Sequence, residues 1–288
     1  MRFDDRRIMD DPCIQARVGI ETARAHAAEL YYGYSRSKLK GLGLEYVDFR
    51  EYSFGDDVRR IDWRLSARSP GELGYKLYVK EYEEEHIHDV TIAVSLSRST
   101  FYKRKPMALT YTTSIVSLMA SRLGDRVTLA LMGGGVEYRR ARNPDSIPYI
   151  IRRTICTGPR GDLVDEILQV AVNMRRGLLV YVVDYDIDPG IVRESLRILK
   201  AKGVRTLNTV VYERFEVEPP GNGVAGFTHP GGYRVHGSIS DVYREIRGHV
   251  VRVKASLRTH GVTLYINPGD LESVKPRLVR GFLAARVL

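Results

Sequence analysis

Residues 89–100 have the sequence DVTIAVSLSRST, a β-branched apolar run that ends in a cluster of hydroxyl side chains. Four similar runs follow: RVTLALM (126–132), LLVYVVD (178–184), VRTLNTVVY (204–212) and VTLYIN (262–267). Helical patterns lie between and after them, at about 105–123, 162–175, 189–202, 240–260 and 270–286. Apolar strands that alternate with helices predict a mostly parallel sheet with helices on both faces. We therefore expect one doubly wound α/β domain over residues 89–288.

Two segments of this domain depart from the alternation. GGGVEYRR (133–140) follows a strand directly, and its glycines and short alternating run predict a tight hairpin with one antiparallel edge strand. EPPGNGVAGFTHPGGYRVHGS (218–238) is rich in proline and glycine and is longer than most connections. It leaves from the carboxyl edge of the sheet, where open α/β sheets bind ligands. Both a partner-contacting loop and a flexible insertion fit it.

The residues before this domain form a region of their own. Asp11-Pro12 is typical of a helix start, and apolar side chains then recur at three- and four-residue steps. Residues 41–85 alternate glycines with short segments dense in charged and aromatic residues, and Leu73–Tyr82 alternates like a strand. We therefore divide the chain into residues 1–88, an N-terminal helix with a small β-rich motif segment, and residues 89–288, the α/β domain.

The composition indicates the compartment. Only two cysteines occur, Cys13 and Cys156, which excludes a disulfide framework and a thiolate zinc site and favours a reducing cytoplasm. No apolar run reaches the roughly 18–20 residues that span a bilayer, and the first residues lack the apolar stretch of a signal peptide. Many charges and few amide side chains are typical of a heat-adapted surface. We therefore expect a soluble cytoplasmic protein.

The charge balance raises the question of nucleic acid. The 45 basic and 35 acidic residues give a net charge of +10, and residues 101–160 are especially rich in arginine and lysine. Nucleic-acid binding by this basic surface is one hypothesis. However, no RNA-binding aromatic signature, helix-turn-helix or zinc-finger spacing accompanies the charge. We favour a structural or protein-docking role for the surface and do not expect a nucleic-acid partner.

Sequence patterns of catalysis are missing from the chain. There is no GxxxxGK[ST] phosphate loop, no GxGxxG opening a helix, no GxSxG elbow and no HExxH. The seven histidines are scattered, and no nucleophile–base pair is apparent. We therefore predict that the protein is not an enzyme and needs no cofactor.

One place could hold a metal ion. Ser97 and Ser99 follow the first strand of the domain, and Asp184 ends the strand LLVYVVD. If these strands are neighbours where the strand order reverses, two hydroxyls and a carboxylate converge on one spot. Oxygen ligands of this kind suit Mg²⁺ or Mn²⁺, so metal-dependent binding of a protein ligand is a second hypothesis.

A second informative stretch is GLGLEYVDFREYSFGDDVRRIDWRLSAR (41–68), in which opposite charges surround Trp63, the only tryptophan. Such a mixture predicts a rigid network of arginine–carboxylate pairs packed against Trp63. The network could serve only to hold the N-terminal segment on the core, or it could form a recognition surface.

This stretch, KEYEEE (80–85) and the strand VTIAVSLSRS together resemble the prokaryotic family called domain of unknown function fifty-eight. Its approximate pattern is G-x-E-F-x-x-x-R-x-Y-x-x-G-D-D-x-R-x-I-D-W-x-x-S-A-R, then K-E-Y/F-x-x-E and a strand ending in D-x-S-x-S. Tyr46 stands where phenylalanine is more usual. The matching residues are Glu45, Arg50, Tyr52, Gly55, Asp56, Asp57, Arg59, Ile61, Asp62, Trp63, Ser66, Ala67 and Arg68.

The resemblance implies a fold like that of von Willebrand factor A domains, with a mostly parallel sheet and one antiparallel edge strand. It also implies a partner, because such proteins are typically encoded beside a MoxR-type AAA+ ATPase and are thought to act with it in the assembly or maturation of other proteins. Many members are anchored by N-terminal membrane helices, whereas this sequence has the character of a soluble version. The resemblance thus implies a non-enzymatic adaptor or scaffold for that ATPase or its client.

The same resemblance weakens the metal hypothesis. The metal-ion-dependent adhesion site of von Willebrand A domains uses D-x-S-x-S, a threonine in a later loop and a further aspartate. Here Ser95 replaces the first aspartate, and Gly161 in PRGDL (159–163) stands where the threonine is expected, with Thr157 nearby. Only Ser97, Ser99 and Asp184 match. Because affinity for hard cations depends on ligand charge and number, we expect weak or absent binding of Mg²⁺ or Mn²⁺ at a degenerate site.

Overall fold

The structure is a computed structural model that describes residues 10–33, 47–71, 74–82, 88–219, 221–228 and 234–287. The chain forms two compact units, residues 1–28 with 87–288 and residues 29–86. The N-terminal helix thus belongs largely with the α/β domain, whereas the division at residue 88 placed it with the motif segment. The helix groups with the domain because its apolar side chains pack there.

The domain is built on one six-stranded sheet in the order β12-β9-β8-β5-β6-β7. All neighbouring strands are parallel except β6 and β7, so the predicted antiparallel edge strand is present. Every residue of β8 is buried, as its continuous apolar sequence requires in a sheet covered on both faces. The strands are β5 (Asp89–Ser95), β6 (Arg126–Met132), β7 (Val136–Ala141), β8 (Leu178–Val183), β9 (Arg205–Val211) and β12 (Val262–Ile266).

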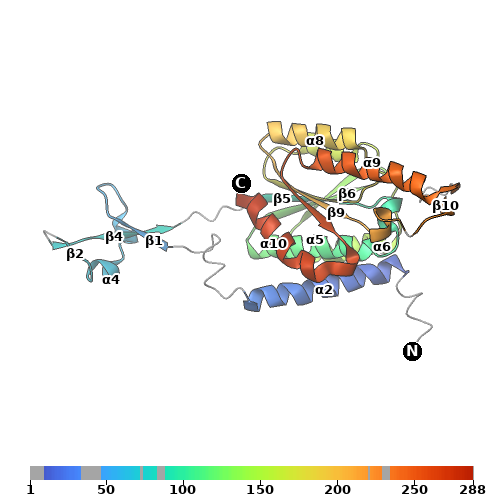
Figure 1. Ribbon diagram of the computed structural model, residues 1–288. Coiled ribbons are helices and arrows are strands. Elements are labelled where there is room, and N and C mark those ends of the chain that lie inside the picture. Colours follow the sequence, from blue (N-terminus) through green and yellow to red (C-terminus); the bar gives the residue numbers. More distant parts are fainter. Residues whose placement is uncertain are drawn as a thin grey trace, which may run out of the picture. The chain divides into compact units, whose positions relative to one another are not determined.

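Helices cover both faces of the sheet (Figure 1). On one face lie α7 (Glu166–Asn173), α8 (Pro189–Ala201) and α9 (Ile239–Leu257), whose apolar side chains form one core cluster with the sheet. On the other face lie α2 (Pro12–Gly33), α5 (Lys105–Arg122), α6 (Ile147–Cys156) and α10 (Leu271–Val287). The sequence analysis did not predict α6. Short 3-10 turns connect the elements at η2 (Arg98–Phe101), η3 (Pro144–Ser146), η4 (Arg214–Glu216) and η5 (Pro268–Asp270).

The long segment 218–238 contains an antiparallel hairpin that the sequence analysis did not foresee. Its strands are β10 (Val224–Thr228) and β11 (Arg234–Ser238), paired from Val224 with Ser238 to Thr228 with Arg234. Residues 220 and 229–233 lie outside the described part of the chain.

Helix α2 docks closely on α5. Asp11 caps its start by accepting hydrogen bonds from the backbone amides of residues 13 and 14, as the sequence predicts. A Cβ atom on Gly19 would overlap the carbonyl oxygen of Met107, so only glycine allows this approach. Further along α2, the buried His26 contacts Tyr111 Oη on α5 (2.8 Å) and Glu272 on α10 (2.7 Å). These contacts explain why the helix belongs to the domain.

A disulfide between Cys13 and Cys156 also links α2 to α6, with the two Cα atoms 4.6 Å apart. The sequence analysis correctly excluded a framework of several disulfides, but its inference of a reducing compartment assumed unpaired thiols. That premise was wrong. The two cysteines are 143 positions apart, so their spacing in the sequence gives no sign of the pairing.

Reduction of this disulfide should lower stability measurably. A crosslink removes chain entropy from the unfolded state and typically contributes about 2–4 kcal/mol. We expect a lower thermal midpoint for Cys156→Ser, and the same decrease for the wild type in reductant. Reductant should not change the midpoint of the Cys13→Ser, Cys156→Ser double variant, and a wild-type midpoint insensitive to reductant would contradict the assignment.

The second unit contains the motif segment. Strands β1 (Val47–Glu51) and β4 (Tyr78–Tyr82) pair antiparallel, and the two-residue strands β2 (Pro70–Gly71) and β3 (Gly74–Tyr75) form a second hairpin. Between β1 and β2 the chain forms η1 (Val58–Arg60) and the single-turn helix α4 (Trp63–Ser66). The strand predicted at 73–82 is therefore interrupted, and Leu73 lies outside the described residues.

Candidate functional site: the carboxyl edge of the sheet and the motif segment

The three serines that follow β5 form a buried hydroxyl chain. Ser95 Oγ lies 3.0 Å from Ser97 Oγ, which lies 3.0 Å from Ser99 Oγ. All three residues are at most 4% exposed. Thr100 fixes the turn, since its hydroxyl donates to the Ser97 carbonyl oxygen (2.7 Å). The serine hydroxyls thus satisfy one another inside the protein.

The strand that carries Asp184 is the direct neighbour of β5. Val94 pairs with Val182 in parallel register, so the residues that follow both strands meet at the same edge of the sheet. Asp184 is fully buried, and its Oδ1 accepts a hydrogen bond from the Asp186 amide (3.1 Å). The sequence-based placement of Asp184 beside the serine turn therefore agrees with the strand order.

Sequence analysis missed the residue that dominates this edge. Lys105, the first residue of α5, is 1% exposed, and its Nζ lies 2.9 Å from Asp184 Oδ2. The same ammonium contacts Glu216 Oε1. Burial alone would lower the pKa of Lys105, but the charges of Asp184 and Glu216 and their hydrogen bonds outweigh it. The pKa of Lys105 is therefore raised, and the ammonium stays charged.

The second carboxylate comes from a turn beyond β9. Glu216 ends η4, and its Oε2 accepts a hydrogen bond from the Glu213 amide (2.7 Å), which closes a capping box. Burial raises the pKa of Glu216, while the nearby Lys105 ammonium opposes that shift. The lysine thus joins the start of α5, the end of β8 and the turn after β9.

A second set of contacts holds the same turn in place. Glu213, 3% exposed, accepts hydrogen bonds from the Arg104 backbone amide (3.0 Å), Nε (3.3 Å) and Nη2 (3.2 Å). Lys103 Nζ lies 4.2 Å from the centre of the Phe215 ring, close enough for a cation–π contact. Residues 103–105 and 213–216 therefore form one electrostatic clamp at the carboxyl edge.

The residues at this edge do not fit a divalent metal ion. Asp184 is the only carboxylate of the predicted set, and an ammonium occupies its Oδ2. The PRGDL loop does reach the end of β5, where the Arg160 amide donates to the Leu96 carbonyl oxygen (2.9 Å). At Gly161, however, φ is +149° and a Cβ would lie 2.9 Å from the Gly134 nitrogen, so no threonine could stand there. Within the described ranges, no group of three or more His, Cys, Asp or Glu side chains could hold a metal.

Replacing the buried lysine should destabilise the domain strongly. Lys105→Met leaves the buried Asp184 and the partly exposed Glu216 without their cation, and breaking a buried ion pair costs about 3–5 kcal/mol. Urea unfolding should show this loss, whereas Lys200→Met on the exposed side of α8 should change stability by less than about 0.5 kcal/mol. Because the pKa of Lys105 is raised, its contribution is complete below the ordinary value of 10.5 and is lost as the pH rises through the raised value. Equal effects of the two variants would contradict the role of the ammonium.

Divalent cations should not bind at this edge. We expect millimolar Mg²⁺ or Mn²⁺ to leave the thermal midpoint of the wild type unchanged, because binding would have to displace the Lys105 ammonium from Asp184. A saturable increase in the midpoint that Asp184→Asn abolishes would show that the metal displaces the lysine.

In the motif segment, the acidic residues build turns. The Asp56 carboxylate accepts a hydrogen bond from each terminal nitrogen of Arg50, at 2.6 Å each, and a third from the Ser53 backbone amide at 2.8 Å. Asp57 caps η1 through the Arg59 amide, and Asp62 caps α4 through the amides of residues 64 and 65. The predicted arginine–carboxylate network thus consists, in these contacts, of one bidentate pair and two helix caps.

The other motif residues have different environments. Trp63 begins α4 and is 64% exposed within its unit, so the indole is not enclosed by the network. Arg59 and Arg68 are also exposed, and Tyr52 is partly buried. Glu45 lies outside the described residues.

Two neighbouring apolar residues share the exposure of Trp63. Phe54 is fully exposed and Val58 is 58% exposed, so three large apolar side chains within residues 54–63 face solvent in this unit. Large apolar side chains gathered on a surface often mark contact sites for other proteins. We call Phe54, Val58 and Trp63 the motif surface.

The comparisons with known proteins agree with the predicted family. The family model described as "Protein of unknown function DUF58" matches residues 48–255. "Uncharacterized protein Rv1480" of Mycobacterium tuberculosis (strain ATCC 25618 / H37Rv) and "Uncharacterized protein Mb1516" of Mycobacterium bovis are each 28% identical over 188 residues. The alignment covers 62% of this chain and only 59% of those relatives.

Solved structures with a similar fold include an aerotolerance-related membrane protein from Bacteroides fragilis NCTC 9343 (12% identity, TM-score 0.42). A second is the conserved hypothetical protein BatB from Bacteroides thetaiotaomicron (13% identity, TM-score 0.43). Both of these matches cover 68% of this chain and 98% of the solved chain. The SpRpn10 VWA domain is similar at 11% identity with a TM-score of 0.41, over 67% of this chain and 94% of that domain. The predicted fold class is confirmed in its architecture: a mostly parallel sheet with one antiparallel edge strand and helices on both faces. No helix of the described segments is long and apolar enough to cross a membrane.

Proposed function

Because this chain belongs to the DUF58 family, we propose that it is a non-enzymatic adaptor that binds a MoxR-type AAA+ ATPase, or a client of that ATPase, through the motif surface. The observation that carries the proposal is the exposure of Phe54 and Trp63 on turns fixed by Asp56 and Asp62. Rigid turns present aromatic side chains at a small entropic cost, and aromatic residues are enriched in the centres of protein interfaces.

The chemistry of the carboxyl edge supports a binding role over catalysis. Lys105 and Asp184 have the reactive side chains of this edge, but both are buried and ion-paired to each other. His26, the histidine in contact with a tyrosine and a glutamate, is 5% exposed and lies between helices. A substrate would have no access to these groups without rearrangement of the core.

The cytoplasmic location remains part of this proposal, since a MoxR-type ATPase acts on ATP, which the cytoplasm supplies. The disulfide removes one of the arguments for it, because unpaired thiols no longer point to a reducing compartment. The bond joins a partly exposed Cys13 to an exposed Cys156, so the redox state of the compartment decides whether it forms.

Titration calorimetry with the MoxR-type ATPase from the same genome, in the presence of nucleotide, tests the proposal. We expect Phe54→Ala combined with Trp63→Ala to weaken binding at least about tenfold, as for aromatic residues at the centre of an interface. The stability of the variant should change little, because both side chains are exposed in their unit. Val251→Ala, an exposed apolar position on α9, is the matched control and should bind like the wild type. Absence of wild-type binding at micromolar concentrations would refute the partner.

A further inference from the structure

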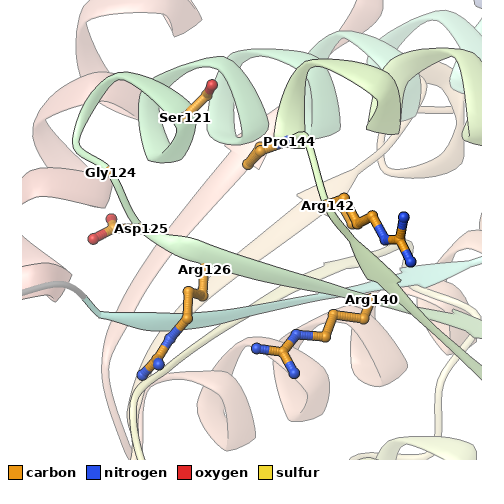
Figure 2. A pocket seen from close by; sticks show the side chains of 8 residues that line it. Ser121, Gly124, Asp125, Arg126, Arg140, Arg142 and Pro144 are labelled. Atoms are coloured by element: carbon orange, nitrogen blue, oxygen red, sulfur yellow. The ribbon is translucent and has the colours of Figure 1, made fainter.

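A cavity of about 560 Å³ lies at the opposite edge of the sheet, lined by residues from the end of α5, from β6 and β7 and from the turn that follows β7. Three arginines line it (Figure 2). Arg126 begins β6, Arg140 lies on β7, and Arg142 follows β7. The remaining lining residues are Ser121, Gly124, Asp125, Ala141 and Pro144.

The strand register brings two of the arginines to one face of the sheet. Thr128 pairs with Arg140, and alternate residues of a strand share a face, so Arg126 and Arg140 point to the same side. Arg142 follows the end of β7 and lines the same cavity. Figure 2 shows the side chains of Arg126 and Arg140 extending to the side away from α5. Tyr138, 44% exposed, is also two residues from Arg140 on this face. We call Arg126, Arg140 and Arg142 the arginine face.

The positive charge here is only partly balanced. Arg126 holds Asp89 in a bidentate pair, with Nε–Oδ1 at 2.8 Å and Nη2–Oδ2 at 3.2 Å, and Arg176 also reaches Asp89 at 3.9 Å. Asp125, the carboxylate among the residues that line the cavity, is paired with Arg286, whose Nη2 lies 3.0 Å from Asp125 Oδ1. In the part of the chain that the structure describes, Arg140 and Arg142 have no ion pair, and both are exposed.

Like charges on adjacent strands repel, so two unpaired arginines beside Arg126 cost stability unless an anion joins them. A bound anion would remove this repulsion. The pair of Arg126 with Asp89 indicates which anion suits the arginine face. The Asp89 carboxylate accepts two hydrogen bonds from the Arg126 guanidinium, the bidentate geometry that carboxylates favour. The unpaired guanidinium groups offer the same geometry to a carboxylate from outside.

We propose that the arginine face binds carboxylate side chains of an acidic, extended segment of a partner protein. The inference rests on the proposed adaptor role and gives it a second contact, on the α/β domain. A protein segment fits better than nucleic acid, because single-stranded nucleic acid needs a longer basic groove with several stacking aromatics, and this face contributes Tyr138 alone from the residues named. Carboxylates on such a segment would pair with Arg140 and Arg142, which line the same cavity.

The test uses the full chain and a fluorescein-labelled peptide in which glutamate alternates with serine, followed by fluorescence anisotropy at several salt concentrations. The same peptide with glutamine for glutamate should not bind. We expect Arg140→Gln combined with Arg142→Gln to weaken binding about tenfold or more, the loss expected for charged hydrogen bonds. Arg193→Gln with Arg252→Gln removes equal charge from exposed positions on α8 and α9, and this control should retain wild-type affinity.

Arg140→Lys with Arg142→Lys keeps the charge but removes the planar fork, and it should also weaken binding. The inference is overturned if the glutamate peptide does not bind, if both arginine pairs affect binding equally, or if the lysine variant retains full affinity. It is also overturned if a single-stranded oligonucleotide of equal charge binds more tightly than the peptide through Arg140 and Arg142. The Phe54→Ala, Trp63→Ala variant should bind the peptide like the wild type. The experiment therefore distinguishes a wrong assignment of the arginine face from a wrong assignment of the motif surface.

Discussion

The ammonium of Lys105 lies within reach of two carboxylates in the interior, and the carboxyl edge of the sheet is organised around it. An uncompensated charge in this position would be very costly, so the start of α5, Asp184 after β8 and Glu216 after β9 must stay together. The Arg104–Glu213 contacts add to this constraint from the neighbouring residues. The strand order alone brings the chain segments near one another, but the ion pairs fix which atoms touch.

This constraint has a consequence for recognition. Open α/β sheets bind ligands at the carboxyl edge. Here a lysine from within the chain supplies the positive charge next to Asp184, and the turn carrying Glu216 lies against it. The Lys105 ammonium is itself buried and offers no contact to a carboxylate from a partner. Recognition is therefore better sought on side chains that remain exposed, such as Phe54 and Trp63 in the motif segment and Arg140 and Arg142 at the edge of the sheet.

The sequence predicted the features that depend on long apolar patterns. The parallel strands are continuous apolar runs, and β6 has the bounds that its run predicts. The glycines at 133–135 predicted the tight turn that leads into the antiparallel β7. Helix α6 was missed because it is short and contains adjacent arginines, although Ile147, Ile151 and Ile155 are spaced as on one helical face. Lys105 belongs to a basic run that looks like an ordinary surface, and only the strand order shows that it reaches Asp184. Similarly, Trp63 has no pattern that distinguishes a buried indole from an exposed one.

The distribution of charge links these observations. Several carboxylates are used internally: Asp184 and Glu216 face Lys105, Glu213 faces Arg104, and Asp125 faces Arg286. In the motif segment, Asp56 and Asp62 are occupied by an arginine and by helix amides. Most of these carboxylates neutralise a basic side chain, so the pairs leave the net charge of +10 in place, and the excess positive charge falls on basic residues outside them. Because the long-range field steers encounters, an acidic partner would be attracted before any specific contact forms, and salt would weaken that attraction.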